Sequence, residues 1–278
     1  MEKHDWNKLT TELDTSEGIG GQSIIEINKD KTLIRKKFNK KDRKYYFIEK
    51  DILQKIDHPN IIKLVDFDDS KNSLYFKYYK EGTSFKYYIK DNLIKIHDFN
   101  IVFSIFTDIL DSLIYLHKNN ITHRDIKLEN ILIDDNGKHI LCDFGLARYA
   151  LTKMRRICGT YNYMAPEMWF LEKKDNHDKY TYKIDIFSLG ALIIEIVNGD
   201  SLFYDEYRCR FKRLYKDLDK YLDEENDEHS EKKIFTDIWY SDDKWKNFKN
   251  IMKRMIDPNP DTRIDYNDIK NKLKSMNH

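Results

Sequence analysis

Cysteine is scarce in this chain of 278 residues, which contains only three. Their number is odd, and Cys142, Cys158 and Cys209 show no spacing typical of a metal site. This pattern argues against a disulfide-bonded secreted protein and against a zinc-binding module. The sequence therefore predicts a reduced intracellular protein, expected in the cytoplasm, with the nucleus left open as an alternative.

An excess of one charge is also absent, because 49 Lys and Arg residues balance 48 Asp and Glu residues and the formal net charge is +1. A strong electrostatic attraction to nucleic acid or to a membrane surface is therefore not expected. Long apolar runs are missing as well: the opening MEKHDWNKLT is polar, and no run of about eighteen apolar residues follows. We expect neither a signal peptide nor a membrane span.

No internal repeat and no low-complexity linker interrupts the chain. The N-terminal part alternates short apolar runs with polar turns, which predicts strands, and has one helical pattern that ends before His58-Pro59-Asn60. The C-terminal part is dominated by helical patterns. The expected strands are 23–28, 32–38, 61–67 and 73–79, and the expected helices are 43–56, 101–119 and 182–197. This order predicts an α+β fold with a ligand cleft between a β-rich part and a helical part.

Two short motifs carry the chemistry. Residues 123–130 are His-Arg-Asp-Ile-Lys-Leu-Glu-Asn, and Asp143-Phe144-Gly145 follows them. Asn130 and Asp143 offer oxygen atoms of the kind that Mg²⁺ prefers, and Asp125 offers a carboxylate that can accept a proton. The two motifs resemble the H-R-D-x-x-x-x-N catalytic loop and the D-F-G metal site of the protein kinase family.

The resemblance implies phosphoryl transfer from ATP, which depends on positioning, metal ions and charge neutralisation. It assigns Asp125 as the base for the substrate hydroxyl, Lys127 to the transferred phosphate, and Asn130 and Asp143 to Mg²⁺. The expected partners are ATP and a protein substrate with a Ser or Thr acceptor, and an activating partner is left open. Lys127 and Thr160 resemble the Ser/Thr-specific members, so the expected activity is that of a protein Ser/Thr kinase.

The resemblance covers nearly the whole chain, so one protein kinase domain is expected over residues 1–278. The implied fold is a bilobal α+β fold with ATP between the lobes. It has a small β-rich N-lobe at about 1–78, a hinge at about 76–82 and a larger helical C-lobe at about 83–278.

A glycine-rich segment at residues 18–25, GIGGQSII, resembles the G-x-G-x-x-G-x-V loop of the family. Glycine lets backbone amides approach phosphates closely, so Gly18, Gly20 and Gly21 are expected to bind the nucleotide. Ser23 replaces the third glycine, and Ile25 is expected to cover the adenine. Taken alone, the segment is equally typical of a turn between two strands.

The segment LIRK at residues 33–36 lies where the family has V-A-I-K. Strand alternation puts Ile34 and Lys36 on one face. The resemblance implies that Lys36 binds the α- and β-phosphates, that Ile34 covers the adenine, and that Glu49 pairs with Lys36. Lys37 is the competing choice for the phosphate-binding lysine.

The hinge segment SLYFKYYKEG at residues 73–82 is harder to align. We place Phe76 at the gatekeeper position behind the adenine, with Tyr78 and Tyr79 along the adenine edge. A register shifted by one residue would put Lys77 at the gatekeeper position instead. Leu132 is also assigned to the nucleotide site.

Residues 159–167, GTYNYMAPE, match the G-T-x-x-Y-x-A-P-E segment that distinguishes protein kinases from small-molecule kinases of similar fold. The resemblance implies three supporting roles. Glu167 pairs with Arg263 in a buried ion pair, Asp185 anchors the catalytic loop, and Thr160 helps to hold that loop.

Arg124 is the residue on which a phosphorylated activation segment docks in many family members. The usual phosphothreonine position is occupied here by Arg156, which cannot be phosphorylated. The remaining hydroxyls before Gly159 belong to Tyr149 and Thr152. We therefore expect activity without phosphorylation at the usual site, with Thr152 as the fallback.

Three alternatives stay open. Basic residues 208–213 and acidic residues 223–229 are either a binding patch or a solvated, self-compensating surface, and the second is favoured. A pseudokinase scaffold would need a broken nucleotide or metal position. All of the expected nucleotide-binding and metal-binding residues are present, although Ser23, Ile34 and Lys77 depart from the family pattern. A small-molecule kinase is disfavoured by the Ala165-Pro166-Glu167 segment.

Overall fold

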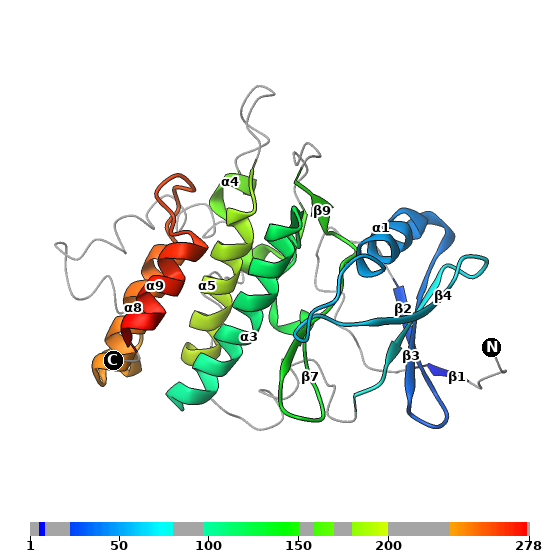
Figure 1. Cartoon of the computed structure of the whole chain (residues 1–278), viewed down its shortest axis with the longest axis horizontal. Helices are drawn as coiled ribbons and strands as arrows, with labels where there is room; N and C mark the ends of the chain where they lie inside the picture. Colours follow the sequence, from blue (N-terminus) through cyan, green and yellow to red (C-terminus); the bar gives the residue numbers. More distant parts are fainter. Residues whose placement is uncertain are drawn as a thin grey trace.

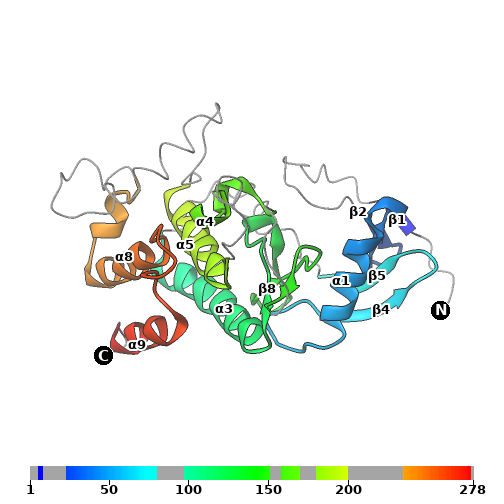
Figure 2. The same cartoon turned by 90° about the horizontal axis from the view of Figure 1, so that it is seen from above.

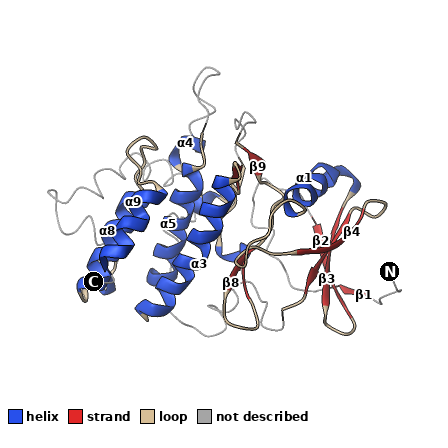
Figure 3. Ribbon diagram, viewed as in Figure 1, coloured by secondary structure: helices blue, strands red, loops and turns tan. Residues whose placement is uncertain are grey.

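The structure is a computed structural model that describes residues 6–8, 23–79, 97–150, 158–169, 180–199 and 234–276. A β-rich N-terminal part and a helical C-terminal part lie next to each other (Figures 1 and 3). This arrangement confirms the predicted α+β fold. The predicted glycine-rich segment up to Gln22, hinge residues 80–82, Thr152, Arg156 and the two charged segments within 208–229 lie outside the described residues.

The N-terminal part contains a five-stranded antiparallel sheet in the order β1-β2-β3-β5-β4. The strands are β1 (Trp6–Lys8), β2 (Ser23–Asn28), β3 (Leu33–Phe38), β4 (Leu64–Asp68) and β5 (Ser73–Lys77). The register pairs Ile25 with Lys36 and Ile27 with Ile34, and β5 places Phe76 opposite Ile34. Because paired residues share a face of the sheet, these five side chains lie on one face.

Helix α1 (Arg43–Leu53) packs beside this sheet and buries Tyr46, Glu49 and Ile52. The sequence predicted a helix to residue 56, but the chain tightens after Leu53, where the N–H of Lys55 donates to the carbonyl oxygen of Ile52 at 3.0 Å. The helix therefore ends before Pro59, as its sequence requires.

The helical part is built around two long helices that pack on each other (Figure 2). The α-helices among its described residues are α3 (Phe99–Lys118), α4 (Pro166–Trp169), α5 (Lys183–Asn198), α8 (Asp243–Met255) and α9 (Tyr266–Met276). Short strands β6 (Ile121–Thr122) and β9 (Arg148–Tyr149) pair with each other, as do β7 (Ile131–Ile133) and β8 (His139–Leu141). Helices α8 and α9 lie at the end of the molecule farthest from the sheet (Figures 1 and 2).

Among the described residues, α3 is one helix that is long and apolar enough to cross a membrane by length and composition alone. Its inward side chains, including Val102, Ile105, Phe106 and Ile109, are fully buried in the core. Packing against α5 and β8 accounts for the apolar composition of α3.

The predicted ion pair between Glu167 and Arg263 is present in the core of the helical part. Both terminal nitrogens of Arg263 donate to the carboxylate, at 2.7 and 2.9 Å. The remaining Nε–H of Arg263 donates to the carbonyl oxygen of Asp257 at 2.8 Å, and the guanidinium lies over the ring of Phe187. The side chain of Arg263 is fully buried, so these partners replace the water that it lost.

Replacing Arg263 with Ala is expected to lower the free energy of unfolding by about 3–5 kcal/mol, because Glu167 keeps a partly buried charge without its cation. Arg263→Lys restores a charge but not the planar fork, so it rescues only part of the loss. Thermal and urea unfolding measure both changes. Arg254→Ala is the matched control, since the exposed Arg254 lies 3.7 Å from Asp268. Equal losses for the two Ala variants would contradict the assigned role.

Candidate active site

Lys36 lies at the meeting point of β3, α1 and the segment that follows β8. Its ammonium nitrogen is 2.8 Å from Glu49 Oε2 and 2.9 Å from Asp143 Oδ1. Lys36 and Glu49 are both buried, whereas the Asp143 side chain is 43% exposed. The predicted contact between Lys36 and Glu49 is therefore present, and Asp143 joins it with a carboxylate that still reaches solvent.

The charges of Lys36 and Asp143 support each other. Burial acts to lower the pKa of Lys36, but the charges of Asp143 and Glu49 outweigh it and hold that pKa above its usual value. Burial also acts to raise the pKa of Asp143, yet the charge and hydrogen bond of Lys36 keep it well below its usual value. Lys36 is therefore a cation and Asp143 an anion at neutral pH.

The competing lysine, Lys37, points the other way. It is exposed on the opposite face of β3, as strand alternation requires. Arg35 lies on the same side as Lys37, and its Nε–H donates to Glu26 at 2.6 Å. The structure therefore places Lys36, and not Lys37, with Glu49 and Asp143.

Asp125 lies in the catalytic loop and contacts three neighbouring side chains. Its Oδ2 lies 2.9 Å from Lys127 Nζ and accepts a hydrogen bond from Asn130 Nδ2 at 3.1 Å. Its Oδ1 accepts from the Thr160 hydroxyl at 3.0 Å, and Lys127 Nζ also donates to that hydroxyl at 3.1 Å. Thr160 therefore contacts both loop residues, as its motif predicted.

Asn130 and Asp143 are brought together by the pairing of β7 with β8. Asn130 ends the short helix η2 (Leu128–Asn130), and its carbonyl oxygen accepts from the N–H of Cys142 at 2.9 Å. The side-chain nitrogen of Asn130 donates to Asp125, which turns the amide oxygen elsewhere. An amide oxygen and a carboxylate suit Mg²⁺, which keeps most of its ligands from water and phosphate. No cluster of three or more His, Cys, Asp or Glu side chains able to hold a metal occurs in the described ranges.

Two residues of the motifs adopt a backbone conformation that is unusual outside glycine. Arg124 has φ 71° and Asp143 has φ 63°, both in the left-handed region. Such residues cost about 1–3 kcal/mol each and persist only where their surroundings fix them. This strain lies at the two motifs that carry the catalytic and metal-binding groups.

Asp185 fixes the backbone of Arg124, the first of these two residues. Its carboxylate is fully buried and accepts from the backbone N–H groups of His123 and Arg124, each at 2.8 Å. His117 Nε2 lies 2.8 Å away, and the hydroxyl of Tyr266 on α9 bonds to the other nitrogen of His117. Burial acts to raise the pKa of Asp185, but the hydrogen bonds from His117 and from the backbone N–H of Arg124 hold it below its usual value. The sequence predicted Asp185 as the anchor but gave no sign of His117 or Tyr266.

Gly159 packs directly on the catalytic loop. Its φ is +100°, and an added Cβ would lie 2.6 Å from the carbonyl oxygen of Arg124. Gly159→Ala is expected to lower kcat about tenfold or more, because the loop that holds Asp125 must move. Gly137→Ala is the matched control: its φ is +77°, but an added Cβ meets nothing within 4 Å. Steady-state assays and thermal unfolding of both variants test this, and an equal loss of kcat in the two would show that backbone strain alone is responsible.

The residues predicted to contact adenine fall into two groups. Ile25, Ile34 and Phe76 share the face of the sheet that carries Lys36, and Leu132 lies on β7 in the helical part. These are the two parts between which the sequence predicted the nucleotide, and their contact with a nucleotide stays a prediction. Ser23 begins β2, as expected for the end of the glycine-rich segment.

Phe76 and Lys77 differ in burial. Phe76 is 3% exposed, whereas the Lys77 side chain is 58% exposed and bonds to Asp135 at 2.9 Å. The N–H of Tyr78 donates to the carbonyl oxygen of Thr32 at 2.9 Å, and alternation turns the backbone groups of Lys77 and Tyr79 to the other side. The side chain of Phe76 therefore faces the interior and that of Lys77 faces solvent, which favours Phe76, and the gatekeeper role itself stays a prediction.

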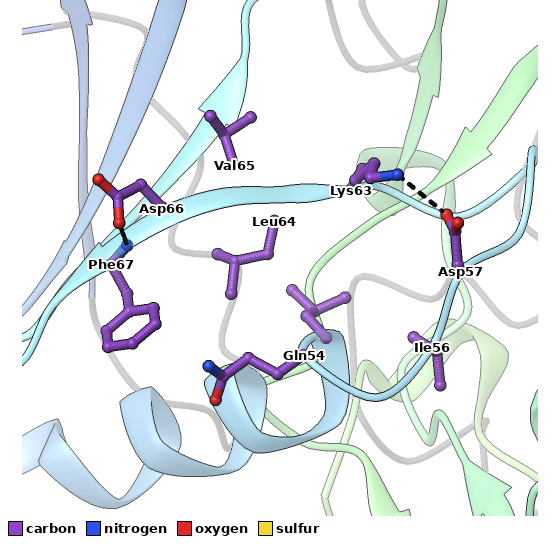
Figure 4. Close-up of a pocket in the computed structure, with 9 residues that line it drawn as sticks. Gln54, Ile56, Asp57, Lys63, Leu64, Val65, Asp66 and Phe67 are labelled. Carbon is purple, nitrogen blue, oxygen red and sulfur yellow. Dashed lines mark hydrogen bonds and ion pairs between the residues drawn. The ribbon is translucent and has the colours of Figure 1, made fainter.

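A hollow of about 330 Å³ lies between the end of α1 and β4 (Figure 4). Leu53, Ile56, Leu64, Val65 and Phe67 line it, together with polar neighbours that include an ion pair between Lys63 and Asp57. The lining contains none of the residues that contact Lys36 or Asp125. This hollow is separate from the candidate active site, and we assign no ligand to it.

Known proteins with similar sequences carry the same kind of domain that the site geometry indicates. The protein kinase domain family matches residues 22–273. Meiosis-specific serine/threonine-protein kinase mek1 of Schizosaccharomyces pombe is 36% identical over 208 residues, which cover 66% of this chain and 45% of the relative. The probable serine/threonine-protein kinase MRK1 homolog of Encephalitozoon cuniculi is 36% identical over 170 residues, which cover 58% and 51%. The mouse phosphorylase b kinase gamma catalytic chain, liver/testis isoform, is 27% identical over 211 residues, which cover 74% and 48%.

Each of these alignments spans about half the length of the relative. The family match, in contrast, covers most of this chain and includes every described residue of the site. The chain therefore belongs to the protein kinase domain family.

Proposed function

We propose that this chain is a protein Ser/Thr kinase that transfers the γ-phosphoryl group of ATP to Ser or Thr hydroxyls of protein substrates. The observation that carries the proposal is the position of Asp125, held between Lys127, Asn130 and Thr160 at hydrogen-bonding distances. Two of the relatives described above are named as serine/threonine-protein kinases, which supports the same acceptor class.

In this mechanism the residues act as follows. Asp125 accepts a hydrogen bond from the substrate hydroxyl and takes its proton late in the transfer. Lys36 holds the α- and β-phosphates while Glu49 fixes its direction, and Lys127 neutralises the transferred phosphoryl group. Asn130 and Asp143 would hold Mg²⁺, which neutralises phosphate charge when it is bound.

A nucleotide-binding scaffold without catalysis is the second candidate. It would need a missing or misplaced group in the site. Lys36 contacts Glu49 and Asp143, and Asp125 contacts Asn130, so the described residues supply both clusters in place. These contacts favour an active enzyme.

We further propose that the enzyme needs no phosphate at the usual activation site. The Nε–H of Arg124 donates to the carbonyl oxygen of Leu146 at 2.7 Å, and Nη1 donates to the Tyr180 hydroxyl at 2.6 Å. Arg124 and Tyr180 are both buried. The arginine that would bind a phosphate therefore has neutral partners within the fold, which fits the presence of Arg156 at the usual phosphorylation position.

The test of the function is transfer itself. Purified chain is incubated with Mg²⁺-ATP and a generic basic protein, beside an Asp125→Ala control, and phosphate is located by mass spectrometry. Phosphoserine or phosphothreonine formed only by the unmutated chain is the expected result. Phosphate transfer by the Asp125→Ala control, or ATP binding by folded unmutated chain without transfer, would overturn the proposal.

A Thr152→Ala variant is expected to stay active, and its inactivity would contradict independence from phosphorylation.

A further inference from the structure

Tyr149 connects the start of the activation segment to α1. Its hydroxyl donates to Asp51 Oδ2 at 3.0 Å, and Lys55 Nζ lies 3.4 Å from the same hydroxyl. Lys55 also bonds to Asp51 Oδ1 at 2.6 Å, and its ammonium lies 5.5 Å from the centre of the Tyr149 ring. Each of the three residues Tyr149, Asp51 and Lys55 thus contacts the other two.

The two sides of this cluster belong to different parts of the fold. Tyr149 ends β9, which pairs with β6, and Ile121 is its partner in that register. The N–H of the next residue, Ala150, donates to the carbonyl oxygen of Asn120. Asp51 lies on α1 and Lys55 follows its end, so the cluster ties α1 to the helical part (Figure 1).

The position of α1 matters because Glu49 lies on the same helix, two residues before Asp51. Glu49 must stay within 2.8 Å of the Lys36 ammonium to hold it toward Asp143. A rigid helix transmits any rotation or shift at Asp51 to Glu49. A contact that fixes Asp51 against β9 therefore also fixes Glu49.

We propose that Tyr149 is a positioning residue whose hydroxyl holds α1 in the orientation that keeps Glu49 on Lys36. The proposal deepens the proposed kinase function and rests on it. Tyr149 touches neither nucleotide nor substrate in this role. It acts through Asp51 and α1 on the lysine that binds phosphate, and its hydroxyl is engaged as a structural contact.

The charge state of the cluster suits this role. The hydrogen bond from Lys55 lowers the pKa of Asp51, so the carboxylate is an anion that can accept from Tyr149. The Asp51 and Lys55 side chains are 47% and 58% exposed, so water screens the cluster. The contact is therefore weak enough to shift an equilibrium between two positions of α1 without deciding whether the protein folds.

A second cluster of the same chemistry provides an internal control. The Tyr46 hydroxyl donates to Asp69 Oδ1 at 2.7 Å, and Lys50 bonds to the same oxygen at 2.6 Å. Tyr46 and Lys50 lie on α1, but Asp69 lies in the turn between β4 and β5 of the N-terminal part. This cluster ties α1 to its own part of the fold and does not cross to β9.

The experiment compares Tyr149→Phe with Tyr46→Phe, each of which removes only a hydroxyl. We expect Tyr149→Phe to raise the KM for ATP and to lower kcat, each by about threefold to fivefold. This is the range by which an exposed hydrogen-bonded pair can shift an equilibrium between two positions of α1. The thermal midpoint is expected to stay within about two degrees. Tyr46→Phe is expected to leave both kinetic constants near those of the unmutated chain. An unchanged Tyr149→Phe, or equal kinetic losses in the two variants, would overturn the proposal.

A double-mutant cycle identifies the partner. Asp51→Ala, which leaves no acceptor for the Tyr149 hydroxyl, is expected to reproduce the loss of Tyr149→Phe, and the double variant is expected to lose no more than either single one. Losses that add fully would mean that Tyr149 acts through some other contact, which also contradicts the proposal.

Hydrogen exchange separates this inference from the proposed function. In Tyr149→Phe the amides of residues 43–53 are expected to exchange faster, while those of α3 stay unchanged. If the unmutated chain transfers no phosphate, the proposed function fails and the exchange result still decides whether Tyr149 fixes α1. If transfer occurs but exchange and kinetics are both unaffected, only the role of Tyr149 fails.

Discussion

Asp125→Asn is expected to lower kcat by about 10²–10⁴-fold, the range typical of a lost general base. The substitution keeps the size and shape of the side chain but removes its ability to take a proton. The KM for ATP is expected to change little, because Asp125 is assigned to the substrate hydroxyl and not to the nucleotide. Steady-state kinetics with a peptide acceptor measure both constants.

The surroundings of Asp125 explain why this variant is expected to fold. The Thr160 hydroxyl can turn its proton and accept from the new amide, and the remaining carbonyl oxygen can still accept from Lys127 and Asn130. Asp57→Asn is a matched control, since the Asp57 side chain is 78% exposed. A variant with Asn at position 125 that keeps more than about a tenth of the activity would show that another group serves as the base.

Lys36→Met is expected to lower kcat/KM by about 10²–10³-fold. This is the cost of losing one preorganised positive charge that binds the phosphates of ATP. Methionine fills much of the lysine volume, so packing is largely kept. The buried carboxyl of Glu49 then has no cation and takes up a proton instead of remaining charged. The loss is expected in the binding of ATP as well as in turnover.

Lys37→Met tests the same strand without touching the cluster. Lys37 is exposed on the opposite face of β3, so its removal is expected to change kcat/KM less than about twofold. ATP binding followed by calorimetry and steady-state kinetics distinguish the two variants. Similar losses in both would mean that the assignment of Lys36 from strand alternation is mistaken.

The groups that local sequence determines were predictable. Asp125 and Asn130 belong to one short loop, and the choice between Lys36 and Lys37 follows from the two-residue period of a strand. The register at Phe76 was ambiguous, because a shift of one residue exchanges the two faces and leaves the composition unchanged. Its pairing with Ile34 favours one register, and only the three-dimensional structure shows that pairing.

Contacts between distant segments were harder to predict. Glu49 and Glu167 could be paired with Lys36 and Arg263 because family motifs mark both members of each pair. His117, Tyr266 and Asp51 carry no such mark, since polar residues on helices are usually solvated. Their partners lie far away in the chain, and only the fold brings α3 to α5 and α9, and α1 to β9.

The anchoring of the catalytic loop by Asp185 has a consequence for how activity responds to heat. Because Asp185 belongs to α5 at the centre of the helical core, we expect the loop backbone at His123 and Arg124 to stay in place as long as that core stays folded. We therefore expect the catalytic loop to melt together with the helical core, in a single cooperative step. Gradual tuning of the rate is expected to fall to the N-terminal part, where the contact between Tyr149 and Asp51 on α1 is open to water.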